Sequence, residues 1–177
     1  GLSAVVLEPA AYSMPKMWTD SETVEVVSKT QGAPAPEKEK VQAEVNEGFL
    51  KRWSGMPRTQ QFVLYKRGEI FSRQVQEEAR AGKPISDYYA LVEQMLKFDF
   101  EADYKQIRIP TMLTANQGDE FFGDQPRQAF DFLTNVPASQ KVLLNLTAAQ
   151  GASLHDQPIG PQVAQEYIFD WLDDMLR

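Results

Sequence analysis

The chain has 177 residues and a net charge of −7, and 42% of its residues are hydrophobic; these values suit one folded domain and argue against nucleic-acid or membrane-surface partners, which both need basic patches. It contains no cysteine, which excludes disulfides within the chain and fits a reducing compartment, so we expect a cytoplasmic protein. With no cysteine and only one histidine, no credible metal site remains. No apolar run is long enough to span a membrane, and no GxxxxGK or GxGxxG motif is present to cradle a phosphate, so we expect no membrane segment and no cofactor.

The first half of the chain is predicted to be a strand, a loop and then helices. Residues 3–8 form an apolar run that ends at Pro9 and reads as a buried parallel strand. Residues 13–36 carry scattered Met, Trp and Val residues and end in the Gly- and Pro-rich residues 31–36, which we expect to form a loop.

Three helices are predicted to follow. In the first, apolar residues four apart make one stripe of Val41, Val45, Phe49 and Trp53. After a break at Gly55 and Pro57, the second runs to Gly82, with Phe62, Val63, Tyr65 and Ile70 inward. Ser86-Asp87 offers an N-cap for the third, whose apolar face is Tyr88, Leu91, Val92, Met95 and Leu96.

The second half returns to strands. Residues 107–114 predict the next strand, with Pro110 near its entry, and residues 142–147 predict the last one. Between them a helix is expected to start at Asp124, the cap, and Pro126, with Ala129, Phe130 and Leu133 inward. The final helix begins near Gly160-Pro161 and carries a stripe of Val163, Tyr167, Ile168, Trp171, Leu172 and Met175. These elements together predict an α/β fold with a parallel sheet.

A polar turn follows each of the last two predicted strands. The first turn contains Asp119, and the second contains His155, the only histidine. Because loops at the carboxyl ends of parallel strands gather at one edge of a sheet, the two side chains are predicted to form an acid–histidine pair. Glu120 is the alternative acid, and a solvated turn or a structural histidine is the plainer alternative. We expect Asp156 to bond the backbone of its own loop.

The order of these motifs resembles the C-terminal third of an α/β-hydrolase. The matching pattern is I-P-T-hydrophobic…G-D, then strand, loop and histidine, then an amphipathic helix. The words DEFFG, GA-x-x-H and IFDWLDDML look like the dihydropseudooxynicotine hydrolase group, which includes fungal pigment-pathway hydrolases that shorten polyketides. The resemblance implies that residues 1–18 and 100–177 belong to the hydrolase core, that residues 19–99 are a helical cap or lid, and that Asp119 and His155 are the acid and histidine of a catalytic triad.

One motif of this family is absent. The G-x-S-x-G nucleophile elbow is not present; Gly1-Leu2-Ser3 matches only its beginning and runs into a strand. We therefore expect the serine and the oxyanion hole to come from a missing N-terminal half, in the same polypeptide or as a second fragment. The isolated chain is then expected to be inactive.

The resemblance implies a serine hydrolase that transfers an acyl group to water. The scissile bond is an ester, an amide or the carbon–carbon bond of a 1,3-diketone, and the group resemblance favours the last, with a small apolar or aromatic substrate from secondary metabolism. Residues proposed to bind substrate, with core packing as the alternative for each, are Trp53, Tyr65, Tyr88, Tyr89 and Phe122. A non-catalytic interaction module, a hydrolase with an aspartate nucleophile and a homodimer all remain open.

Overall fold

The computed structural model describes the whole chain, residues 1–177, and divides it into two units. One unit comprises Gly1–Ser13 and Asp99–Arg177, and the other comprises Met14–Phe98. The sequence placed these boundaries after residues 18 and 99 instead. The structure assigns Trp18 to the helical unit, because its indole is buried in that unit's core.

The first unit is a three-layer α/β sandwich, which confirms the predicted fold class. Three parallel strands, β1 (Val5–Leu7), β2 (Thr111–Asn116) and β3 (Lys141–Leu146), lie side by side in that order. The helices of this unit are α6 (Glu101–Tyr104), α7 (Gln125–Phe132) and α8 (Pro161–Met175), with short 3-10 turns at Ala138–Gln140 and Ala148–Gln150.

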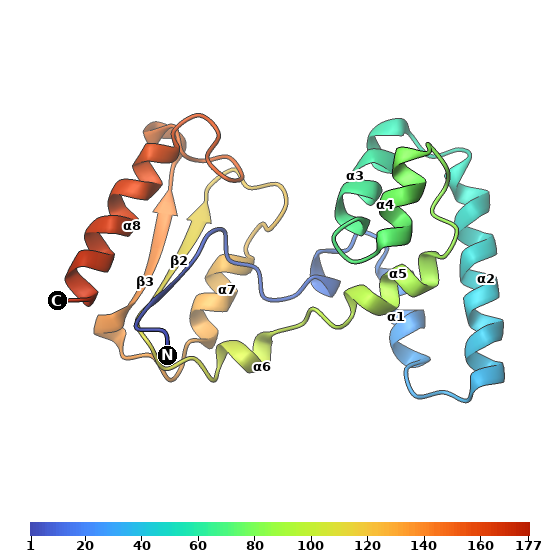
Figure 1. Ribbon diagram of the computed structural model, residues 1–177, viewed down its shortest axis with the longest axis horizontal. Helices are drawn as coiled ribbons and strands as arrows, with labels where there is room; N and C mark the ends of the chain where they lie inside the picture. The colour runs from blue at the N-terminus through green and yellow to red at the C-terminus, as the bar shows by residue number, and fades with distance from the viewer. The chain divides into compact units, whose positions relative to one another are not determined.

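The two faces of this sheet are covered by different helices. Successive strand residues point to opposite faces, so neighbours in the sequence enter different cores. Leu7, Leu113 and Leu143 pack with α7, whereas Val6, Met112 and Val142 pack with α8. Figure 1 shows α7 and α8 on opposite sides of the strands. β2 is buried along its whole length because it has a strand on each side and a layer on each face.

β1 and β2 are shorter than the sequence suggested, and β3 lies one residue earlier than the predicted residues 142–147. β2 starts at Thr111 instead of residue 107, because Pro110 has no N–H to give to the ladder and contributes only its carbonyl, which accepts from Val5 N at 2.9 Å. β1 covers Val5–Leu7 of the predicted residues 3–8. The prediction that Tyr167 lies against the sheet was wrong, since this residue is 47% exposed on α8. Asp124 occupies the predicted N-cap position of α7, but its side chain makes no capping bond and pairs with Arg127.

The second unit is entirely helical. It contains a 3-10 turn at Pro15–Met17 and helices α1 (Ser21–Lys29), α2 (Ala35–Trp53), α3 (Arg58–Gly68), α4 (Arg73–Arg80) and α5 (Tyr88–Met95). α5 is the most buried of these helices, and Tyr88, Tyr89, Leu91, Val92 and Met95 all enter the core. None of the helices in the chain is both long and apolar enough to cross a bilayer.

Two features of this unit differ from the sequence analysis. No element was predicted for residues 21–29, but they form α1, which Asp20 caps by accepting from Thr23 N at 3.2 Å. The segment predicted as the second helix forms two helices, α3 and α4. The buried residues of α3 are Leu64 and Gly68. An added Cβ at Gly68 would come within 3.0 Å of Val75 and Leu91. α3 therefore packs closely through Gly68, which leaves other predicted core residues exposed: Phe62, Val63 and Ile70.

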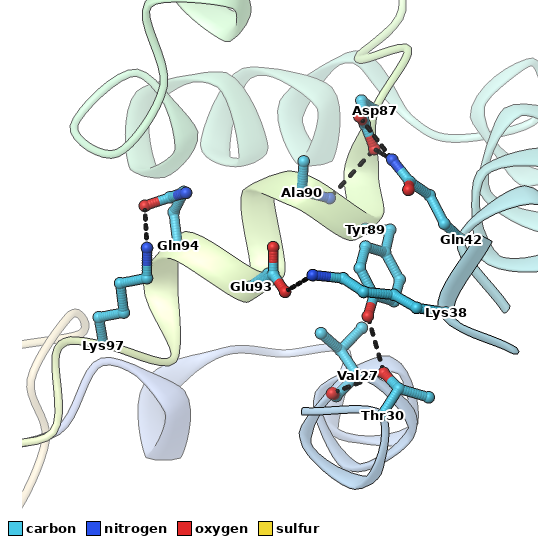
Figure 2. Close-up of polar contacts among 10 residues, drawn as sticks. All are labelled: Val27, Thr30, Lys38, Gln42, Asp87, Tyr89, Ala90, Glu93, Gln94 and Lys97. Carbon is cyan, nitrogen blue, oxygen red and sulfur yellow. Dashed lines mark hydrogen bonds and ion pairs between the residues drawn. The ribbon is translucent and has the colours of Figure 1, made fainter. Parts of the chain in front are cut away.

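Polar contacts tie α5 to α1 and α2 (Figure 2). Asp87 caps α5 by accepting from Ala90 N at 3.1 Å, and the same carboxylate accepts from Gln42 Nε2 at 2.9 Å. Lys38 of α2 pairs with Glu93. The Tyr89 hydroxyl lies 2.8 Å from the Thr30 hydroxyl at the end of α1. The buried polar groups of α5 thus find partners on its neighbours, as burial requires.

Candidate active site

The turn after β2 holds Asp119 with every carboxylate oxygen engaged. Oδ1 accepts from the backbone N–H groups of Phe121, at 2.7 Å, and Phe122, at 3.0 Å. Oδ2 lies 3.0 Å from His155 Nδ1. The Asp119 side chain is only 1% exposed. A buried carboxylate with three bonds of this kind is fixed in both position and orientation.

The loop after β3 is attached to the end of β2 at several points, and this brings His155 to Asp119. Gly118 N donates to Ser153 O at 2.8 Å, and the Asn116 side-chain amide donates to Leu154 O. The Thr147 and Gln150 side chains form a capping box in the turn that precedes the loop. Because β2 and β3 are parallel neighbours, both loops leave the same edge of the sheet.

The backbone directly after His155 has an uncommon conformation. Asp156 has a φ of 56° and Gln157 a φ of 43°, in the left-handed region that residues with a Cβ seldom adopt. Gln157 is buried, and its amide nitrogen has no hydrogen-bond partner. Strain of this kind persists only where surrounding contacts enforce it, and it is frequent at functional sites.

The hydrogen bond to Asp119 determines what the histidine can do. An ionised carboxylate only accepts, so Nδ1 carries the proton and Nε2 presents a lone pair. The imidazole is 27% exposed, so Nε2 is accessible. It lies 3.5 Å from Asp156 Oδ2, and no hydroxyl of this chain contacts it. An imidazole oriented in this way has the geometry that a general base requires.

Two aromatic rings lie beside His155, and a further carboxyl, that of Glu8, interacts with the neighbouring Asp156. The ring centroids of Phe121 and Phe122 lie 4.6 and 5.1 Å from that of the imidazole. The pKa of Glu8, an exposed residue directly after β1, is raised, first because neighbouring atoms remove part of the hydration of its carboxyl and second because of the negative charge of Asp156. Sequence reasoning did not select Glu8; its position directly after a strand was the available signal. The expected backbone bond of Asp156 is not made, since its carboxylate faces the imidazole instead.

The residues expected to bind substrate are in both units. Phe122 is beside the imidazole. Trp53, Tyr65, Tyr88 and Tyr89 lie in the core of the helical unit or pack against it. Tyr65 donates to Lys83 O, while the Tyr88 hydroxyl accepts from Trp18 Nε1 at 2.8 Å. Of these four, only Tyr88 lines a cavity of that unit described below. No cluster of His, Cys, Asp and Glu side chains is arranged to hold a metal ion.

Comparisons with known proteins add little to this geometry. No family model and no curated protein matches the chain. A hydrolase from Pseudomonas aeruginosa aligns with 96% of this chain and 55% of its own, at 17% identity and a TM-score of 0.43. MenH from S. aureus aligns with 99% of this chain and 60% of its own, at 13% identity and a TM-score of 0.44. The chain therefore spans little more than half the length of either protein, and TM-scores this low do not establish a common fold.

Proposed function

We propose that this chain contributes the histidine and the acid of a serine-hydrolase centre of α/β-hydrolase type. The observation that carries the proposal is the 3.0 Å contact between His155 Nδ1 and Asp119 Oδ2. The two residues follow neighbouring parallel strands, in the chain order acid then histidine that the α/β-hydrolase fold uses. Fixation of Asp119 by two backbone N–H groups supports a role in orienting the imidazole.

The chemistry proposed for this pair is acyl transfer to water. Nε2 of His155 takes the proton of a serine hydroxyl as its oxygen adds to the substrate carbonyl, and Asp119 stabilises the imidazolium that results. The imidazolium then gives the proton to the leaving group, which is an alcohol, an amine or the enolate carbon of a cleaved 1,3-diketone. Water adds to the acyl-serine by the same proton transfers, which releases the acid and restores the serine.

The nucleophile is proposed to lie outside this chain. Ser3, the residue that imitates the start of an elbow, is exposed and precedes β1, at the opposite end of that strand from Glu8. Since no hydroxyl of the chain contacts Nε2, the serine and its oxyanion hole are assigned to a further part of the same polypeptide or to a second fragment. A small apolar or aromatic substrate suits the two phenylalanines beside His155.

Labelling with a serine-directed fluorophosphonate tests the proposal on the protein purified from its source. We expect one labelled serine, on the polypeptide that carries this chain or on one that co-purifies with it. Replacement of His155 by Ala should slow labelling by orders of magnitude, since the serine loses its base. Asp156→Ala is the matched control, because Asp156 is exposed and Asp119 remains in place.

Two results would overturn the proposal. Labelling that proceeds equally well in His155→Ala would mean that the histidine activates no serine. An absence of labelling, together with no hydrolysis of 4-nitrophenyl butyrate or of a 1,3-diketone, would indicate a non-catalytic interaction module. Hydrolysis without labelling would instead indicate an aspartate nucleophile.

A further inference from the structure

The helical unit contains a cavity of about 530 Å³ that is separate from His155. It lies among α2, α3, the start of α5 and the turn that precedes α1. Its apolar walls are Phe49, Met56, Val63, Leu64 and Tyr88. Small-molecule sites in proteins are typically ~300–1,000 Å³ in volume, mostly apolar, with a few polar groups that orient the ligand. This cavity has the size and the composition of such a site.

The aromatic side chains of the cavity are held by contacts within the helical unit. Phe49 and Tyr88 stack with their centroids 3.8 Å apart, and Trp53 packs on Phe49 at 5.6 Å. Tyr88 is only 1% exposed, and its hydroxyl accepts from Trp18 Nε1 at 2.8 Å. Side chains held in this way lose little further entropy when a ligand binds, which favours affinity.

The polar part of the cavity contains an ion pair between Asp20 and Arg52, besides Thr19, Thr59 and Gln60. Arg52 Nη2 donates to Asp20 Oδ2 at 2.9 Å. The aspartate also accepts from Thr23 N and Thr23 Oγ1, because it caps α1. Asp20 is thus occupied by protein donors, whereas a guanidinium has five N–H groups and this is its one hydrogen bond. The other N–H groups of Arg52, a lining residue whose side chain is 53% exposed, make no hydrogen bond within the chain.

Charge selects among possible ligands. Asp20 and Arg52, the ionised groups of the lining, cancel one another, and residues 14–98 contain 13 Lys and Arg residues against 12 Asp and Glu residues. Neither an anionic nor a cationic ligand would therefore meet an uncompensated opposite charge in the lining. A neutral molecule with an aromatic body and a carbonyl oxygen matches both the walls and the free donors.

We propose that this cavity binds a neutral aromatic ketone or a molecule of similar shape, with its oxygen on Arg52. The site lies wholly within residues 14–98 and shares no residue with the Asp119–His155 pair. It therefore does not depend on the proposed hydrolase function.

Calorimetric titration of the complete chain with 2-acetylnaphthalene tests this site. We expect saturable binding of one molecule per chain. Val63→Trp should abolish binding by filling the cavity, and it should be tolerated because Val63 is 37% exposed. Phe62→Trp is the matched control, because Phe62 is the adjacent residue, is 61% exposed and does not line the cavity. Circular dichroism and thermal melts verify that both variants fold.

A second pair of variants tests the polar contact. Arg52→Gln should weaken binding about tenfold, the lower range for loss of a hydrogen bond to a charged group. Arg58→Gln, also in the helical unit but outside the lining, should leave binding unchanged. The proposal is overturned if the native chain shows no saturable binding, if Val63→Trp binds as well as Phe62→Trp, or if Arg52→Gln binds as tightly as the native chain. Loss of binding in His155→Ala would move the ligand to the other unit and would also refute it.

Discussion

The protonation of one imidazole nitrogen gives a direct test of the site, because the chain contains a single histidine. In the native protein, Nδ1 should carry the proton and Nε2 should be free. Replacement of Asp119 by Asn puts an amide in the same place. The Asn oxygen can still accept from Phe121 N and Phe122 N, so its amide N–H groups face Nδ1. The imidazole must then accept at Nδ1 and carry its proton on Nε2.

The magnitude follows from the burial of Asp119. A hydrogen bond to a charged group contributes about 1.5–3 kcal/mol. The 3.0 Å bond from His155 is made to a side chain that is 1% exposed, so water does not compete for it. This free energy corresponds to a preference of roughly ten- to a hundredfold for the Nδ1–H tautomer at a pH where the ring is neutral. Asp119→Asn should reverse the preference.

Long-range proton–nitrogen NMR of ¹⁵N-labelled protein distinguishes the two tautomers by the nitrogen shifts of the ring. Asp156→Asn is the control, because this residue lies 3.5 Å from Nε2, is largely exposed and should leave the Nδ1–H form dominant. A native spectrum with Nε2 protonated, or one that Asp119→Asn does not change, would refute both the geometry and the assignment of His155 as a base.

Three further predictions concern stability. Leu113→Ala, in the centre of the sheet and fully buried, should lower the free energy of unfolding by about 2–5 kcal/mol in urea titrations; Leu176→Ala, 57% exposed, should change it by less than about 0.5 kcal/mol. Asp87→Ala removes the cap of α5 and should cost about 1–2 kcal/mol, and an unchanged urea midpoint would contradict the capping role. Glu8→Gln should become progressively more stable than the native chain as the pH of thermal melts rises above 4.5, the usual pKa of a glutamate. The fold raises the pKa of Glu8, so ionisation of this residue removes stability as pH rises through that raised value, and glutamine avoids the loss; a difference that does not vary with pH would contradict the reasoning.

Local signals in the sequence were sufficient for several elements. Apolar runs between polar turns located β2 and β3, and residues four apart located α2 with Phe49 and Trp53 in the core. The cap at Asp87 was confirmed. These features depend on a few neighbouring residues, and for that reason a single sequence reveals them.

Other features depend on contacts between distant residues. α1 was missed because its cap, Asp20, follows a stretch with no helical periodicity. Val63 was expected inside, but α3 is buried through Gly68, which Leu91 and Val75 approach closely, and side-chain hydrophobicity does not encode such an approach.

The sequence by itself determined that an acid and the single histidine follow consecutive parallel strands. Only the tertiary structure decided that Asp119 is buried and that its Oδ1 accepts from two backbone N–H groups. The tertiary structure also decided that Nδ1 of His155 is the nitrogen that contacts Asp119 Oδ2. The amino-acid sequence gives the residue types and their order. The distances between loops 36 residues apart exist only after strand pairing and two layers of helices have fixed both loops at one edge of the sheet.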